Sequence, residues 1–201
     1  MFRLTSWLAI IACLYGCTNL ANLREILNTV SYDSATFTYQ LDAQTAQISF
    51  AVGNTQGKFR VYSAQLGFDS MALNSGVLDV TLATGSVDLA NPLIEELLRG
   101  KDWFASNTHK LATFRSTEFA VASNAATIQG FLTIREISQP MTLQVNFPQG
   151  PPNLASDPAK ISFVATSQFS RASFGMNALT EFAPDRVELE IQGHFIAYTA
   201  D

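Results

Sequence analysis

Few residues in this chain could perform catalysis or hold a metal. Its two histidines are His109, in the polar loop 106–110, and His194, which shares the polar face of a predicted strand with Glu188 and Glu190. A metal site needs several histidine, cysteine or carboxylate ligands that converge. The sequence also lacks the Gly-x-Ser-x-Gly, His-Glu-x-x-His and phosphate-binding glycine motifs. It therefore predicts no metal site, no catalytic residues and no enzymatic activity.

Both cysteines, Cys13 and Cys17, lie near the N-terminus, so we expect neither a disulfide nor thiol chemistry in the folded domain. Residues 1–3 give a short positive start, and residues 4–14 form an apolar run. This pattern is typical of a signal peptide and is too short for a permanent membrane-spanning helix. We predict a signal peptide over residues 1–16.

The end of this segment, Leu14-Tyr15-Gly16-Cys17, resembles the lipobox of bacterial lipoproteins. The resemblance implies cleavage before Cys17 and lipid on its sulfur and amine, and several acyl chains would make a firm membrane anchor. Tyr15 departs from the pattern, which usually has a smaller residue there. Two alternatives stay open. The run that ends at Cys13 also fits locally but leaves a very short apolar region, and an ordinary secretory peptide would make both cysteines incidental.

Thr18, where some lipoproteins have Asp, implies by the same resemblance sorting to the outer membrane. We therefore expect an outer-membrane lipoprotein that faces the periplasm or, without lipidation, a soluble periplasmic protein. Residues 17–35 are mixed and polar and predict a lipidated tether, followed by one domain over residues 36–201. Four apolar residues of the tether have the spacing of a short helix: Leu23, Ile26, Leu27 and Val30.

The domain that follows alternates apolar and polar residues almost throughout. In residues 140–147, for example, Met141, Leu143 and Val145 are separated by polar side chains. A period of two predicts strands with one buried and one solvated face, and many such strands in succession must close or stack. The predicted strands are 36–42, 46–52, 58–69, 76–84, 112–121, 126–135, 140–147, 160–169 and 186–198. We therefore expect an all-β, closed antiparallel, lipocalin-like barrel of eight or nine strands.

Two local features modify this pattern. Within the predicted strand 58–69, the inward-facing residues change from odd-numbered to even-numbered positions. A β-bulge near Tyr62-Ser63 would explain this change. A single helical interruption is predicted over 91–99, with Asn91 as N-cap, Pro92 as the first helical residue and Arg99 near the end. A short amphipathic helix between barrel strands most naturally caps an open end.

Composition restricts the partners. Apolar residues make up 47% of the chain and charged residues only 14%, and the net charge is −5. Nucleic acid is an unsuitable partner because no run of Lys and Arg offers the positive surface it needs. The 15 phenylalanines against five tyrosines suit a dry interior, since Phe needs no hydrogen-bond partner.

The inward-facing stripes supply the candidate ligand site. Such stripes either line a channel or simply fill a small barrel, because an eight-stranded interior is just wide enough for side chains. Arg171 has two interpretations: it bonds loop carbonyls or a carboxylate, or it orients a polar head group at the pocket rim. Trp103 and Phe104 are likewise core plugs or ligand contacts. The candidate ligand-binding residues are Phe50, Val52, Phe59, Val61, Val80, Leu132, Ile134, Leu143, Phe163, Phe169, Arg171 and Phe174.

Several segments together resemble the YceI-like family over about residues 37–198. The resemblance implies a lipocalin-like antiparallel barrel whose hydrophobic channel binds polyisoprenoid chains, including isoprenoid quinones, or other long-chain lipids. The chain departs from the family's pattern at Arg135-Glu136, where His-Gly is frequent, and at Ala105, where an acidic residue is common. The matching segments are Gly57–Phe59, Leu97–Phe104, Ala112–Thr117, Gly130–Ile134, Gln139–Leu143 and Phe169–Met176.

The function expected from these observations is that of an envelope protein that sequesters or carries an isoprenoid-like apolar chain, with a membrane anchor and no cofactor other than the bound lipid. The alternative is a non-catalytic envelope scaffold whose barrel is filled and whose outer face or loops bind a protein. An unrecognised hydrolase is a third alternative, which would have to use Ser or Thr with one of the two exposed histidines.

Overall fold

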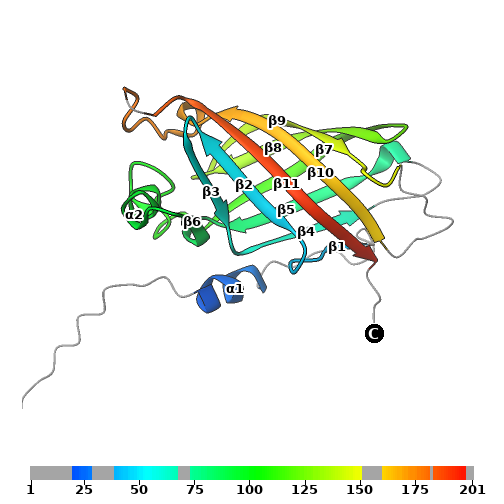
Figure 1. The fold of residues 1–201 in the computed structure, drawn as a ribbon, viewed down its shortest axis with the longest axis horizontal. Helices are drawn as coiled ribbons and strands as arrows, with labels where there is room; N and C mark the ends of the chain where they lie inside the picture. Colours follow the sequence, from blue (N-terminus) through cyan, green and yellow to red (C-terminus); the bar gives the residue numbers. More distant parts are fainter. Residues whose placement is uncertain (1–19, 29–38, 68–72, 151–159, 182, 198–201) are drawn as a thin grey trace, which may run out of the picture.

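One antiparallel sheet of eleven strands makes up most of the molecule (Figure 1). The computed structural model describes residues 20–28, 39–67, 73–150, 160–181 and 183–197. The strands are β1 (Tyr39–Leu41), β2 (Gln47–Val52), β3 (Thr55–Phe59), β4 (Tyr62–Gly67), β5 (Val77–Ala83), β6 (Val87–Leu89), β7 (Leu111–Ala122), β8 (Ala125–Ile134), β9 (Ile137–Asn146), β10 (Lys160–Ser170) and β11 (Arg186–Ala197).

Eight of these strands close into a barrel. Their order is β1-β4-β5-β7-β8-β9-β10-β11, and β1 completes the ring by pairing with β11 through Tyr39 and Ala197. The order of these eight strands around the ring follows their order in the chain, as in an up-and-down barrel, and two-residue turns join β7 to β8 and β8 to β9. The predicted closed antiparallel barrel is therefore confirmed.

The remaining strands, β2, β3 and β6, branch from the same edge of β11. β11 pairs with β2 over Glu188–Gln192 and with β1 over Phe195–Ala197. Gly193 lies between these two stretches, where a Cβ atom would be 2.8 Å from the Cα of Ala46. Glycine thus allows the start of β2 to approach β11 closely at the point where β11 changes partner.

Two details of the predicted strands were wrong. Residues 58–69 were expected to form one bulged strand, but β3 ends at Phe59 and β4 begins at Tyr62, with a bend at Arg60-Val61 between them. The parity change therefore reflects two strands, and a register shift lies instead in β7 between Ser116 and Glu118. The short strand β6 was not predicted at all.

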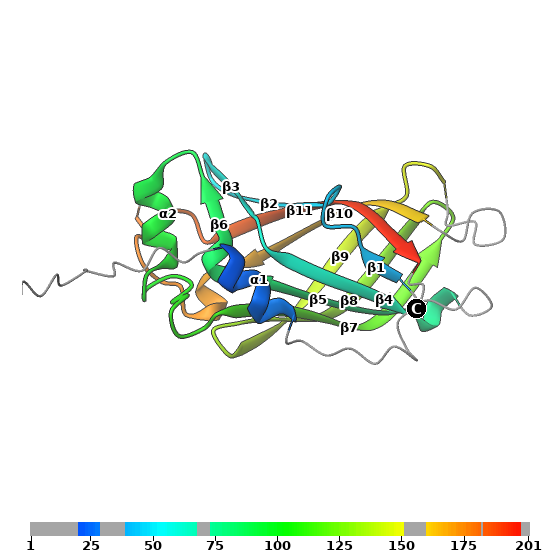
Figure 2. The ribbon, with the colours of Figure 1, turned by 90° about the horizontal axis from the view of Figure 1, so that it is seen from below.

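Two short α-helices lie near one end of the barrel (Figures 1 and 2). Helix α2 (Pro92–Arg99) is the predicted one, and the side chain of Asn91 caps it by accepting a hydrogen bond from the Leu93 amide at 3.0 Å. Arg99 holds α2 to the barrel by donating to the carbonyls of Gly85 and Val87, both at 2.9 Å.

Helix α1 (Leu20–Asn28) comes from the predicted tether and packs against the outer wall of the barrel. Leu23 and Leu27 are buried against Val61 and Ala83, so the expected helical spacing is confirmed for these residues. The rest of residues 17–35, the predicted signal peptide 1–16 and Cys17 lie outside the described residues. No helix in the described part of the chain is long and apolar enough to cross a membrane.

Candidate functional site

The interior of the barrel contains an apolar cavity at the end away from α2. Its volume is about 70 Å³, and all the side chains around it are apolar. They come from the halves of the strands that point away from the helices, among them Leu78, Val80, Phe119, Leu143, Phe163 and Phe195. Phe163 and Phe195 stack with their ring centroids 5.1 Å apart and form part of this wall.

Three of the twelve residues predicted from the sequence, Val80, Leu143 and Phe163, line this cavity. The other nine do not. Val61 faces helix α1 on the outer wall, because the bend at Arg60-Val61 turns it away from the interior. The remaining eight belong to or pack around the main core outside the cavity lining: Phe50, Val52, Phe59, Leu132, Ile134, Phe169, Arg171 and Phe174.

Aromatic side chains fill the end of the barrel next to α2, which we call the plugged end. The ring of Phe59 lies 5.5 Å from that of Phe50 and 5.7 Å, edge-on, from that of Phe104. Phe169 meets Phe174 edge-to-face at 5.4 Å, and Phe174 is fully buried. These contacts favour the interpretation of Phe104 as a core plug.

Arg171 ties the plugged end together from inside. Its side chain is only 1% exposed and donates to the carbonyls of Pro184 at 3.1 Å, of Ala178 and Ala183 at 2.8 Å, and of Met176. Its guanidinium also lies 4.7 Å from the centre of the Trp103 ring, a cation–π geometry. This corresponds to the first interpretation of Arg171, in which it bonds loop carbonyls.

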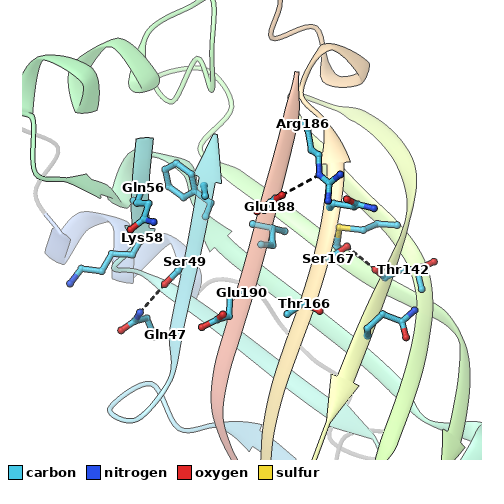
Figure 3. A pocket seen from close by; sticks show the side chains of 18 of the residues that line it. Gln47, Ser49, Gln56, Lys58, Thr142, Thr166, Ser167, Arg186, Glu188 and Glu190 are labelled. Carbon is cyan, nitrogen blue, oxygen red and sulfur yellow. Dashed lines mark hydrogen bonds and ion pairs between the residues drawn. The ribbon is translucent and has the colours of Figure 1, made fainter. Parts of the chain in front are cut away.

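A second hollow lies on the outer face of the barrel (Figure 3). This open trough has a volume of about 1460 Å³ and runs across β3, β2, β11, β10, β9 and β8. Its labelled side chains are mostly hydroxyls, amides and carboxylates, such as Ser49, Thr142, Thr166, Glu188 and Glu190. An apolar chain gains little from such a surface, and in this the trough differs from the cavity.

Ion pairs lie at the edges of the trough. Asp88 binds Arg60 and lies 3.7 Å from the ammonium of Lys58, and the hydrogen bond from Arg60 lowers the pKa of the Asp88 carboxyl. At the opposite side, Arg186 lies 3.2 Å from Glu188. These pairs leave the trough without an excess of positive charge.

The barrel wall carries two carboxyls with pKa shifts of opposite direction. Burial raises the pKa of Asp79 on β5, although Arg115 at 3.3 Å partly offsets this. At the plugged end, hydrogen bonds from Ser170 and from the Ala172 amide lower the pKa of Asp185.

His109 and His194 lie apart from any set of acidic or thiol groups that could hold a metal. Within the described residues no three His, Cys, Asp or Glu side chains converge. The nearest contact of this kind is His109 Nδ1, which lies 3.7 Å from the exposed carboxylate of Glu136. This arrangement supports no specific metal chemistry in the described part of the chain.

The departures from the family's pattern fall at strained backbone positions. Ala105, Arg135 and Glu136 all have positive φ angles, of 48°, 53° and 65°. Arg135 donates to the carbonyl of Gly175 at 2.8 Å, so the β8–β9 turn is tied to the loop beyond β10. All these positions lie at the plugged end, away from the cavity.

Comparisons with known proteins agree with this architecture. The profile of the YceI-like domain matches residues 39–195. A UPF0312 protein of Vibrio parahaemolyticus is 25% identical over 154 residues, which is 74% of this chain and 81% of that protein. A UPF0312 protein of Pseudomonas aeruginosa is 28% identical over 137 residues, 61% of this chain and 72% of that protein.

Solved structures show the same barrel. BcnA of Burkholderia cenocepacia superposes with a TM-score of 0.68 at 27% identity, covering 79% of this chain and 99% of that one. A polyisoprenoid binding domain from Saccharophagus degradans, implicated in plant cell wall breakdown, superposes with a TM-score of 0.57 at 14% identity and covers 81% and 99%. At that identity the likeness concerns the fold alone.

Proposed function

Since the chain belongs to the YceI-like family, we propose that it binds an apolar chain, such as a polyisoprenoid or isoprenoid quinone, inside its barrel. The observation that carries this proposal is the cavity, because all the side chains around it are apolar and it lies within a closed wall. A dry apolar cavity has nothing to offer a polar substrate and suits a hydrocarbon tail. The polyisoprenoid binding domain of the same fold supports the proposal by analogy.

The energy of such binding comes from burial alone. Each CH₂ group removed from water contributes roughly 0.8 kcal/mol, so about ten sheltered carbons supply ~8 kcal/mol before the costs of binding. A net energy of that size would correspond to roughly micromolar affinity. No catalytic group is needed for this, and we propose a binding protein without enzymatic activity.

The cavity must open to hold a chain of that length. Its volume of about 70 Å³ is well below the roughly 300–1,000 Å³ of ordinary ligand pockets. The cavity is walled largely by side chains such as Phe119, Phe147 and Phe163, which can change rotamer without breaking the sheet. Ligand binding therefore requires these rings to turn aside.

The same small volume favours a second candidate function. A barrel that stays filled would serve as an envelope scaffold, and its outer face or loops would bind a protein partner. The two functions differ in whether the barrel interior opens to hold a ligand. An experiment that measures the binding of an apolar ligand distinguishes them.

The full chain carrying Cys17→Ser, stripped of lipid by unfolding and refolded, provides this test. We expect it to bind geranylgeraniol, a C20 isoprenoid alcohol, with micromolar affinity or better by isothermal titration calorimetry. Leu143→Trp should abolish binding because the indole occupies the cavity, whereas Thr113→Trp on the exposed face of β7 should not. Absence of binding in the parent chain would favour the scaffold.

We also propose that the chain is a lipoprotein of the cell envelope, held by lipid on Cys17 and facing the periplasm from the outer membrane. The lipobox-like residues 14–17 support this proposal. Cys17→Ser should move the protein from the membrane to the soluble fraction after cell lysis. A mutant that stays in the membrane after high-salt washing would show that the anchor lies elsewhere.

A further inference from the structure

The barrel wall contains a seam between β9 and β10. These strands pair through only three residue pairs, from Val164 with Asn146 to Thr166 with Gln144. Over the same length β10 pairs with β11 without interruption, from Lys160 to Ser170. Both β9 and β10 continue toward the plugged end beyond the paired stretch, so their facing edges lack a regular ladder there.

Two residues disfavour a regular ladder beyond the paired stretch. Pro140 on β9 has no amide hydrogen to donate. Ser167 on β10 donates its hydroxyl hydrogen to the Thr142 carbonyl at 2.7 Å, so a side chain takes the place of a backbone donor (Figure 3). A side-chain hydroxyl separates from its acceptor by one bond rotation, whereas ladder bonds open together. Beyond the paired stretch, the seam can therefore open without breaking a continuous ladder.

The seam lies between the outer trough and the apolar cavity. Met141 and Ser167 border the trough, while Leu143 and Ala165, two residues further along the same strands, line the cavity. Residues two apart on a strand share a face and lie about 7 Å from each other. A ligand in the seam would thus contact the trough at one end and the cavity at the other.

The side chains beside the seam are neutral hydrogen-bonding groups. Thr142, Thr166 and Gln168 present hydroxyls and an amide to the trough. On the next strand, Thr166 faces Glu190 and Gln168 faces Glu188, whose carboxylates add negative charge. The nearby cation, Arg186, is already paired with Glu188. This surface suits an alcohol or a carbonyl and repels a phosphate.

We propose that the β9–β10 seam is the head-group site and lateral passage for an apolar ligand with a neutral, hydrogen-bonding head. The tail passes between the strands into the cavity, and the head stays in the trough beside Thr142 and Gln168. This inference rests on the proposed binding of an apolar chain and adds its route and its head-group chemistry.

A disulfide across the seam tests the route. In the full chain with Cys13→Ser and Cys17→Ser, Thr142→Cys with Gln168→Cys joins the two edges, by oxidation or by a short bifunctional thiol reagent. The matched control, Val164→Cys with Gln192→Cys, bridges a facing pair of the continuous ladder that already holds β10 to β11, and neither residue lines the trough or the cavity. We expect the seam bridge to slow uptake of geranylgeraniol from phosphatidylcholine vesicles by about tenfold or more, as closure of a gate does. Reduction should restore the rate, and the control bridge should leave it unchanged.

Ser167→Ala provides the converse test, because it removes the hydroxyl bond that closes the seam. It should speed uptake and hydrogen exchange at residues 141–143 while the fold is retained. The head-group arm compares geranylgeraniol with geranylgeranyl diphosphate, which has the same tail, and we expect the alcohol to bind at least about tenfold more tightly.

The outcomes separate the two proposals. If the parent chain takes up neither ligand, the proposed function fails. If it takes up geranylgeraniol at the same rate with the seam bridged, or prefers the diphosphate, binding stands and the seam proposal is overturned.

Discussion

The two ends of the barrel interior are built from the same kind of strand but differ in how they are filled. At the plugged end, a buried arginine bonds four carbonyls and aromatic rings pack edge to face. At the other end, apolar side chains surround a small cavity and no described charged residue lines it. A closed wall can thus combine a rigid half with a half that has room to rearrange.

The difference follows from the hydrogen bonds that the buried backbone groups of each end require. The loop between β10 and β11 brings four backbone carbonyls to the buried guanidinium, and buried carbonyls need donors. Arg171 supplies them and fixes the geometry. The cavity end contains ladder-paired strands whose backbone is already satisfied, so its side chains need only pack. Rotating such side chains costs little compared with breaking a buried polar network.

The largest effect should come from removing Arg171. Arg171→Met leaves four carbonyls without their donor, and we expect a loss of about 3–5 kcal/mol in the free energy of unfolding. Arg186→Met, the same change at an exposed site, should cost within about 0.5 kcal/mol. Urea denaturation of both variants measures the difference. Equal small losses would mean that the plugged end does not depend on Arg171.

A matched pair of valine substitutions compares the ends directly. Val87→Trp enlarges a fully buried side chain at the plugged end and should cost at least the ~1–3 kcal/mol typical of overpacking. Val80→Trp enlarges a side chain that lines the cavity and should cost less, because the cavity and mobile neighbours accept part of the indole. Thermal melts give the comparison. The same cost at both positions would show that the cavity end is as rigid as the plugged end.

The smallest effects concern pH. The pKa of Asp185 is lowered in the folded state, so its contribution to stability is present above the unfolded value of about 3.9 and is lost as the pH falls below it. The pKa of Asp79 is raised, so stability decreases as the pH rises from about 3.9 through the folded value. At pH 7, Asp185→Asn should therefore lower the free energy of unfolding slightly, and Asp79→Asn should raise it.

Urea titrations of these two variants between pH 3 and 7 check the signs. The curve of Asp79→Asn should approach that of the parent near pH 3, and the curve of Asp185→Asn should move toward the parent as the pH falls toward the lowered pKa of Asp185. Changes of the same sign at pH 7 would contradict the opposite pKa shifts of the two carboxyls.

The sequence predicts the barrel well because alternation is a strong local signal. The sequence places Phe50 and Phe59 correctly on a buried face, but it does not show that they belong to the plugged end. Alternation shows which side of the sheet a residue faces and not its position along the barrel axis. Val61 shares the parity of Phe59 and yet packs on α1, since the bend after Phe59 is invisible to alternation. Strand β6 is too short to have a recognisable period.

The β9–β10 seam could not be predicted from the sequence. Pro140 within a strand is a signal for an interrupted ladder. The bond from Ser167 to the Thr142 carbonyl, however, depends on the register between two strands that are joined by a long connection. Helix α2, by contrast, is predicted closely because its N-cap and first residue are neighbours in the sequence.

The most direct test of the central claim, that the interior opens to hold an apolar chain, is native mass spectrometry of the protein purified from bacterial envelopes without harsh detergent. We predict an added mass from a bound isoprenoid-like lipid, which chloroform–methanol extracts and which is absent from the Leu143→Trp variant. A bare polypeptide mass, even after incubation with excess C20–C40 isoprenoids, would contradict it.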